Sequence, residues 1–288
     1  MTSFLIAFVL FYVWHGLGIT VGYHRLLSHR SFKCVKPVEY FFVLGGYLAY
    51  EGSPIWWAAI HRAHHRHVDT PLDPHSPRYG VMHALFGWLF ELKYPPHIDP
   101  YVQCKDLVVD PIYKALECNG NLRQMNNVCF LTNMAFRAAL WYFCGWQIAL
   151  ASLLASVAVM QIPLMLNVIC HIPRLGYKNF IMDDDSTNNW IVAILGFGEG
   201  WHNNHHAYPG SARNGMLPHE LDMSFFTIQL MKAVGLVSWF NPGPDMKTVS
   251  RDKRVPKTLT FAQTASSNFD YLQAQSHAEK VPVGAGKR

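Results

Sequence analysis

Closely spaced histidines are the residues of this sequence best suited to chemistry. His24 and His29 form a pair, and two later groups hold His61, His64 and His65 and then His202, His205 and His206. Residues at i, i+3 and i+4 share one face of a helix, so each later group is predicted to direct three imidazoles toward one point. Neutral imidazole is a common ligand for iron, zinc and copper. Because the same spacing occurs twice, the pattern favours a metal centre over a solvated basic patch.

The number of histidines favours two metal ions over one. A mononuclear zinc hydrolase needs three protein ligands and one open position, whereas these groups offer eight histidines. The sequence contains no His-Glu-x-x-His motif, and the Glu-x-x-His pattern of soluble di-iron bundles occurs once, from Glu199 to His202. We therefore expect a centre that is rich in imidazole and poor in carboxylate.

The segments around these histidines resemble the three histidine boxes of membrane fatty acid desaturases. They read Gly-Ile-Thr-Val-Gly-Tyr-His-Arg-Leu-Leu-Ser-His at 18–29, His-Arg-Ala-His-His at 61–65 and Gly-Glu-Gly-Trp-His-Asn-Asn-His-His at 198–206. The resemblance is closest to the bacterial acyl-lipid Δ9 and stearoyl-CoA desaturase branch and extends over residues 5–240, including the flanking Asp-Pro-His at 73–75. Members usually carry another span ahead of the first box, so the stem of this chain is expected to pack differently.

The resemblance also implies a set of site residues. The metal ligands would be His24, His29, His61, His64, His65, His171, His202, His205 and His206, with Asn167 holding a metal-bound water. Metal-bound imidazoles usually donate their other ring N–H to an acceptor, and the candidates are Glu199, Asp73 and His75, although either acid could equally cap a helix. Trp57, four residues before His61, resembles an aromatic that lines the acyl tunnel of the family, with an interfacial anchor as the alternative.

The activity that the resemblance implies is O2-dependent desaturation at two iron ions, which places a cis double bond, expected at Δ9, in a long saturated acyl chain. No acid or base can take a proton from an unactivated methylene, so a metal centre oxidised by O2 is required. A separate ferredoxin-like or cytochrome electron donor is expected, because the sequence lacks a His-Pro-Gly-Gly stretch, a cysteine cluster and a Gly-x-Gly-x-x-Gly motif.

Two other functions remain open at this point. A histidine-box hydroxylase or acetylenase would use the same ligands and differ only in its product. A histidine-rich metal transporter would place polar ligands near the bilayer midplane. In this sequence the histidine groups flank the apolar segments instead, which disfavours transport.

Two residues before the second box bear on the carrier of the acyl chain. Acyl-CoA enzymes of the family have an Arg-Asp pair there, whereas this chain has Ala59 and Ile60. Neither side chain carries charge, so an anionic coenzyme would lose a contact worth roughly 1.5 to 3 kcal/mol. We expect a lipid-linked acyl chain. CoA or acyl-carrier-protein thioesters are the alternative, if Arg62, Arg66 or Arg78 binds phosphate instead.

Charge-poor segments predict the membrane helices that must position these residues. Half of the 288 residues are apolar and only 15% are charged, against roughly 25% in a soluble domain. Spans are expected at about 3–22, 128–144 and 147–170, with a turn near Gly145, because a span needs ~20 apolar residues. The apolar segment 40–60 is interrupted by Glu-Gly-Ser-Pro at 51–54 and is expected not to span.

The third apolar region contains one difficulty. Arg137 argues against a span there, at ~3 kcal/mol for a charge at the bilayer centre. A single crossing, however, would leave His171 ~30 Å from its partners. Two crossings are therefore expected.

The fold expected is an all-α integral membrane protein, with a transmembrane helical stem and a cytoplasmic helical cap that holds a dimetal site. The membrane domain is predicted to cover residues 1–246, followed by a polar tail at 247–288. Four bases follow the first span and none precedes it, so the positive-inside rule places the boxes in the cytoplasm. The net charge of +5 suits an anionic membrane surface, and no basic stripe interleaved with aromatics indicates a nucleic-acid partner. An acidic run at 183–187 is expected to cap a short helix from Trp190.

Overall fold

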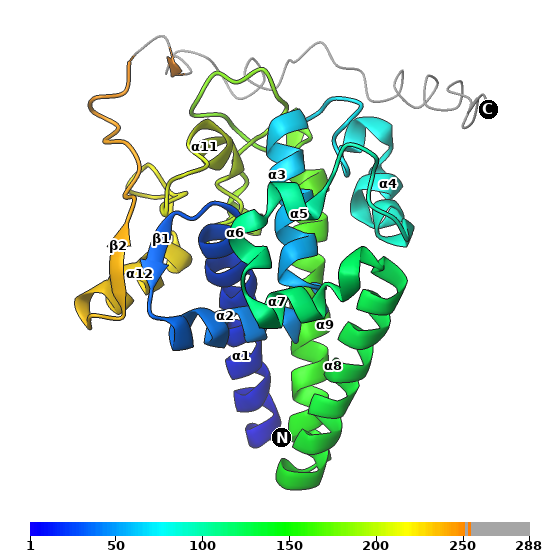
Figure 1. Ribbon diagram of the computed structural model, residues 1–288. Coiled ribbons are helices and arrows are strands. Elements are labelled where there is room, and N and C mark those ends of the chain that lie inside the picture. The colour runs from blue at the N-terminus through cyan, green and yellow to red at the C-terminus, as the bar shows by residue number, and fades with distance from the viewer. Residues whose placement is uncertain (251–252, 255–288) are drawn as a thin grey trace, which may run out of the picture.

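A tapered bundle of helices forms most of the computed structural model, which describes residues 1–250 and 253–254 (Figure 1). The predicted polar tail therefore lies largely outside the described residues. The all-α prediction needs one correction, because β1 (Phe32–Cys34) and β2 (Val237–Phe240) form a small antiparallel sheet. In this sheet Phe32 is paired with Phe240, so the sheet ties the end of the first box to a segment some 200 residues later.

Three long helices form the narrow end of the molecule. Helix α1 (Thr2–Leu17) continues into the π-helix η1 (Gly18–Ser28), and α8 (Leu122–Cys144) is followed by α9 (Trp146–Ile169). Within the described residues, two helices are long and apolar enough to cross a membrane, Thr2–Ser28 and Trp146–Ile169. These two correspond to the first and last of the three predicted spans. Helix α8 lies beside α9 and is long enough, but it does not meet the same criterion of composition.

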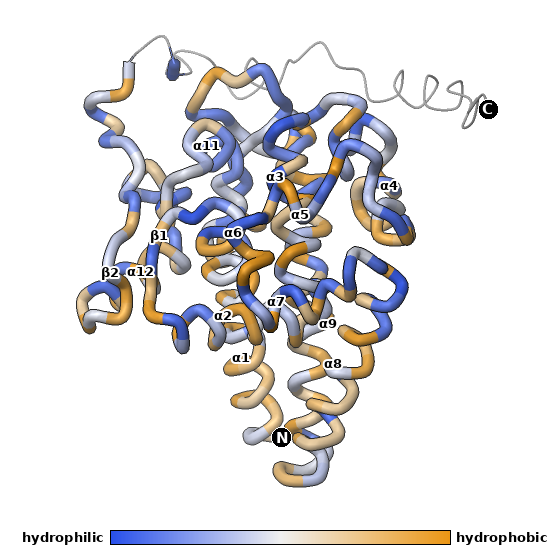
Figure 2. Tube along the Cα trace, viewed as in Figure 1, coloured by the Kyte–Doolittle hydropathy of each residue, from blue (hydrophilic) through white to orange (hydrophobic). Residues whose placement is uncertain are grey.

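Aromatic side chains surround the turn between α8 and α9. Gly145 joins the two helices with φ +90°, which favours glycine. Trp141, Tyr142, Phe143 and Trp146 are all exposed there. Figure 2 shows that the helices of this end are predominantly apolar, whereas the wide end carries most of the hydrophilic residues.

Arg137 is buried between α8 and its neighbours rather than exposed to lipid. It donates to Asn133 Oδ1 at 2.6 Å, to the Leu48 carbonyl at 2.7 Å and to Ser156 Oγ at 2.9 Å. Its ring neighbour is Tyr50, whose centroid lies 5.0 Å from the guanidinium carbon. Partners of this kind make a cation at membrane depth tolerable, so Arg137 is compatible with a spanning α8.

The apolar segment 40–60 is divided between two helices, as the sequence predicts. Helix α2 (Lys36–Tyr47) ends before the break, and α3 (Pro54–His67) begins after it. Pro54 occupies the first turn of α3, and Ser53 Oγ accepts from the Trp56 backbone N–H. The break redirects the chain so that α3 carries the second histidine box into the wide end of the molecule (Figure 1).

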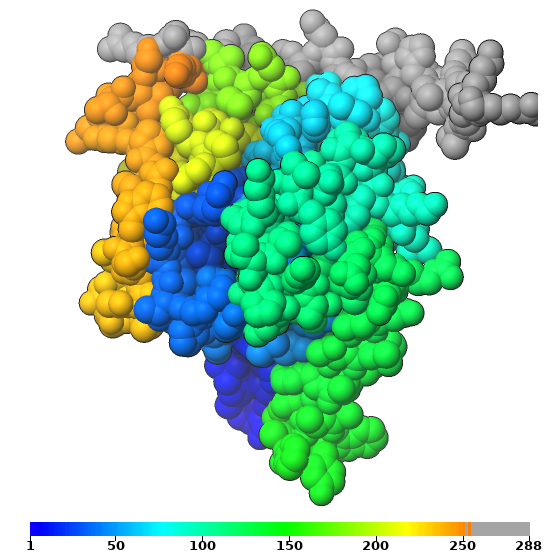
Figure 3. Space-filling view, in the orientation of Figure 1, coloured from blue at the N-terminus to red at the C-terminus, as the bar shows by residue number. Residues whose placement is uncertain are grey.

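Short helices and loops complete the wide end around α3 (Figure 1), and the space-filling view shows how much broader this end is than the tip of the stem (Figure 3). They are η2 (Pro77–Tyr79), α4 (Val81–Leu85), η3 (Gly87–Phe90), α5 (Pro100–Gln103), α6 (Lys105–Val108), α7 (Pro111–Leu116), η4 (Cys118–Gly120), η5 (Pro173–Leu175), α10 (Trp190–Leu195), α11 (His202–Ala207) and α12 (Met223–Ala233). The predicted cap of α10 is wrong: Asn189, not the acidic run, accepts from the Val192 backbone N–H.

Candidate metal centre

The nine predicted histidine ligands lie together in two groups. The five-histidine group contains His24, His29, His61, His65 and His205, and the four-histidine group contains His64, His171, His202 and His206. Within each group the potential ligand atoms all lie within 4.8 Å of one another. Each group could therefore hold one metal ion.

The two boxes with three histidines each divide their side chains between the groups, so the prediction that each box points to a single place is wrong. On α3, His61 and His65 belong to the five-histidine group and His64 to the other. On α11 the division is reversed, with one imidazole in the five-histidine group and two in the four-histidine group. Consecutive residues of a helix are rotated by about 100°, so neighbours such as His64 and His65 face different points.

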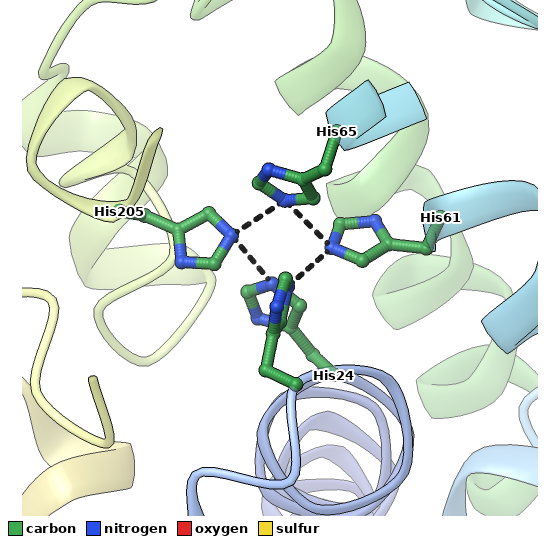
Figure 4. A group of neighbouring side chains, drawn as sticks. His24, His61, His65 and His205 are labelled. Atoms are coloured by element: carbon green, nitrogen blue, oxygen red, sulfur yellow. Dashed lines mark hydrogen bonds between the residues drawn. The ribbon is translucent and has the colours of Figure 1, made fainter. Parts of the chain in front are cut away.

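The imidazoles of the five-histidine group face one another through their Nε2 atoms (Figure 4). The Nε2 atoms of His24 and His205 are 3.0 Å apart, and those of His29 and His61 are 2.8 Å apart. His65 lies between, with its Nε2 at 3.1 Å from that of His61 and 2.9 Å from that of His205. Five nitrogens that converge in this way match the donor set of an imidazole-bound ion.

Burial favours the neutral form of imidazoles in this group. Desolvation, together with the neighbouring histidines, lowers the pKa of His61, His65 and His205 well below the usual value. A neutral imidazole has one N–H and one lone pair, so five rings facing one centre cannot all satisfy each other by hydrogen bonds. A bound cation would satisfy the converging lone pairs, so the residues present fit a metal ion.

Carboxylates accept from the outward ring nitrogens of the four-histidine group. Asp73 lies 3.0 Å from His64 Nδ1, Asp69 3.2 Å from His171 Nδ1 and Asp184 3.0 Å from His206 Nδ1. Burial acts to raise the pKa of these carboxyls, but the imidazole partners outweigh it, and each pKa is lowered. All three are therefore ionised acceptors.

The sequence pointed to only one of these three carboxylates. Asp73 was named for its place in the Asp-Pro-His stretch, whereas Asp69 and Asp184 were missed. Asp184 belongs to the acidic run that was expected to cap a helix. Its burial beside His206 is seen only in the structure. His75, the other predicted partner, stacks on His64 with ring centroids 4.5 Å apart.

One carboxylate serves the five-histidine group. Glu199 Oε2 lies 2.5 Å from His24 Nδ1, and the same carboxylate pairs with the buried guanidinium of Arg25. Arg25 also pairs with Asp222 at 3.1 Å. The carboxylates of Glu199 and Asp73 thus both lie beside ring nitrogens of the histidine groups.

A cavity that encloses about 610 Å³ of space, part of it open to solvent, borders both histidine groups. Apolar side chains of η1 and α9, such as Ile19, Val159 and Leu166, line it together with histidines of both groups. A second cavity, of about 560 Å³ with its opening to solvent included, is lined by Glu51 and several aromatic residues. Both cavities are thus placed beside the candidate metal centre.

Trp57 and Asn167 line both cavities. The Trp57 ring stacks on His61 with centroids 4.9 Å apart, and its Nε1 donates to Glu51 Oε2 at 2.8 Å. Asn167 lies in the last turn of α9, four residues before His171, which follows the end of the helix. An elongated ligand that filled both cavities would therefore lie against these two residues and beside the two histidine groups.

Comparison with known proteins identifies the family. The profile for fatty acid desaturases matches residues 2–221. The chain belongs to the fatty acid desaturase family. It is therefore an oxidoreductase of the desaturase class, as the resemblance of the three histidine boxes implied, and the match spans all three boxes.

Relatives of this desaturase act on acyl chains with different carriers. It is 39% identical to an sn-1 stearoyl-lipid 9-desaturase of Anabaena variabilis, over 81% of this chain and 82% of that protein. It is 37% identical to an acyl-CoA C20 Delta5-desaturase of Anemone leveillei, over 82% and 73% of the two chains. An sn-1 stearoyl-lipid 9-desaturase of Synechocystis is 38% identical over 80% and 69%.

Proposed function

We propose that this desaturase is an O2-dependent di-iron enzyme that introduces a cis double bond, at Δ9, into a saturated long acyl chain linked to a lipid. The observation that carries the proposal is the convergence of nine buried or half-buried histidines into two groups that border one apolar cavity. The five-histidine group would hold one iron. The four-histidine group would hold the other, with Asn167 keeping a water at it.

Two iron ions bound there would supply the O2 chemistry that breaks unactivated methylene C–H bonds. The chain itself supplies position and shelter. Ile19, Val159 and Leu166 exclude water from the cavity beside the histidines, and a closely fitted apolar channel fixes which carbons lie next to the metals. Trp57, held by Glu51, forms the wall at this point.

The proposed membrane arrangement has three crossings, through α1, α8 and α9, in a domain of residues 1–246. Arg137 is satisfied by carbonyl and hydroxyl groups, which permits α8 to cross beside α9. The exposed aromatic residues around Gly145 are typical of a membrane interface. The positive-inside rule then places this turn outside and the helical cap with its dimetal site on the cytoplasmic face.

The surroundings of the second box support a lipid-linked substrate. Ala59 and Ile60 are both buried, so neither meets a polar head group. Two of the three bases that could replace a phosphate-binding pair are engaged elsewhere: Arg62 pairs with Asp106 at 2.7 Å and Arg78 with Asp185 at 2.9 Å. The third, Arg66, is exposed and donates to the Arg62 carbonyl. The stearoyl-lipid and acyl-CoA relatives have comparable identity to this chain, so the proposal of a lipid-linked substrate rests on these local contacts.

Lipid analysis tests the proposal directly. Cells that express the chain are compared by gas chromatography and mass spectrometry with cells that express His64→Ala, and new cis-Δ9 monoenes are expected only in the former. A hydroxylated or acetylenic product would instead favour a histidine-box hydroxylase or acetylenase. Purified enzyme with a ferredoxin-like or cytochrome donor should turn over phospholipid vesicles faster than stearoyl-CoA, and the reverse order would contradict the lipid-linked carrier.

A further inference from the structure

We propose that the two metal positions are unequal and that Asp69, Asp73 and Asp184 make the four-histidine position the one that releases its ion more slowly. The inference rests on the proposed function, because it takes both histidine groups to hold metal. It goes further by assigning a role to three carboxylates that hold imidazoles rather than metal. They are positioning residues in this account.

The carboxylates are distributed unevenly around the two groups. Three of the four outward ring nitrogens in the four-histidine group lie 3.0 to 3.2 Å from an aspartate oxygen. In the described part of the chain, the only ion pair with the five-histidine group is that of His24 with Glu199. Each group also has an Nδ1 atom that is buried without a hydrogen-bond partner in the described residues, that of His205 in the five-histidine group and that of His202 in the four-histidine group. Three carboxylates thus lie beside imidazoles of the four-histidine group, whereas one lies beside an imidazole of the five-histidine group.

The charge of these partners differs as well. Glu199 shares its charge with the Arg25 guanidinium. Asp73 is held by the backbone N–H groups of Asp69 and His75, at 2.9 and 3.2 Å. Asp184 accepts from the backbone and hydroxyl of Ser186, which are neutral donors. Cations approach the four-histidine group too, since Arg78 and Lys178 donate to the backbone carbonyls of Asp69 and Asp184. The Glu199 carboxylate, however, is paired directly with a guanidinium, so its negative charge is the more directly compensated.

These contacts affect a bound metal through the imidazole. A carboxylate acceptor fixes the tautomer that presents Nε2 to the ion, holds the ring in orientation and makes Nε2 a stronger donor. Loss of one such partner typically weakens metal binding 10-fold to 100-fold. The five-histidine group has one more imidazole, and this additional ligand should slow the release of metal from that group. We expect three carboxylates to outweigh one additional neutral ligand, because a water at Asn167 can complete the smaller set.

Release of metal to a chelator tests the inference. Full-length enzyme in detergent is loaded with two iron ions per chain, and the loss of each is followed with a colorimetric chelator. The wild-type protein is expected to release iron in two phases. Asp184→Asn, which keeps an acceptor oxygen but removes the charge, should accelerate the slow phase 10-fold to 100-fold and leave the fast phase unchanged. Glu199→Gln should accelerate the fast phase alone.

Two further variants keep the result interpretable. Asp73→Asn repeats the test on another carboxylate and serves if Asp184→Asn does not fold. Asp110→Asn removes a carboxylate that pairs with Lys36, outside both histidine groups, and it should leave both phases unchanged. A single phase for both ions in the wild type, or acceleration of the fast phase by Asp184→Asn, would overturn the inference. Failure to bind two ions at all would instead overturn the proposed function.

Discussion

Two buried polar clusters lie within this mostly apolar protein, and they differ in how their polar atoms are satisfied. Around Arg137, the two terminal guanidinium nitrogens donate to a carbonyl, a hydroxyl and an amide oxygen at 2.6 to 2.9 Å, and only Nε lacks a partner in the described residues. Among the histidines, ring nitrogens converge on each other, and His206 Nε2 is buried without a partner in the described residues. Buried polar groups that hydrogen-bond to one another indicate a structural role, whereas buried polar groups that lack such partners indicate a site for a ligand.

Loss of a histidine should give the largest effect and should separate the two clusters most clearly. His64→Ala removes one of four ligands from its group, and we expect activity to fall by at least ~100-fold, while the helical stem stays folded. The measurement is desaturase turnover with circular dichroism of the same sample. His219→Ala, at an exposed histidine outside the centre, is the control and should keep full activity. Comparable turnover of the two variants would contradict the assignment.

Loss of Arg137 should instead lower the stability of the fold and leave the metal content unchanged. Arg137→Met preserves much of the side-chain volume but leaves the Leu48 carbonyl and Asn133 without a donor. An unsatisfied buried group costs about 1–3 kcal/mol, so we expect a clearly lowered melting temperature in detergent. Iron content per folded chain should remain that of the wild type. If the iron content fell together with the melting temperature, the polar cluster around Arg137 would not be independent of the two histidine groups.

Glu51 connects the two clusters and should give a smaller, pH-dependent effect. It lies in the break beside Tyr50, near Arg137, and accepts from Trp57 beside His61. Burial raises its pKa to about 8. From pH ~4.5 to ~8 the folded chain keeps a proton that the unfolded chain releases, so the unfolding free energy falls as pH rises, by a few kcal/mol.

The matching variant is Glu51→Gln, which retains an acceptor for Trp57 but cannot titrate. Thermal unfolding at pH 6 and pH 8.5 should show a smaller loss of stability in Glu51→Gln than in the wild type. The variant is expected to be the more stable of the two at pH 8.5. An equal loss in both proteins would show that Glu51 is ionised throughout.

Local patterns predicted much of the molecule. The break at 51–54 and the turn at Gly145 follow from helix-breaking residues, and the nine histidines followed from spacing and resemblance. The assignment of His64 and His65 to different groups did not, because it depends on the orientation of α3 against η1 and α11. Contacts such as Asp69 with His171, 102 residues apart, join segments whose proximity no local pattern specifies.

The small sheet and the position of Asp184 could not be predicted for the same reason, because both depend on contacts between distant segments. The β1–β2 sheet pairs segments from the two ends of the described chain, each only three or four residues long. Strands so short carry almost no periodic signal. The acidic run at 183–187 was compatible with a helix cap from its sequence alone, but tertiary contact directs Asp184 to His206 instead.

Iron stoichiometry is the most direct test of the central claim that the two histidine groups form a dimetal centre. The wild-type protein, expressed with iron and purified without chelator, is measured by elemental analysis alongside His64→Ala and His205→Ala, which each remove a ligand from a different group. We predict about two irons per chain in the wild type and about one in each variant, because each loss weakens one position. One iron per chain in the wild type, or an unchanged content in both variants, would contradict the account.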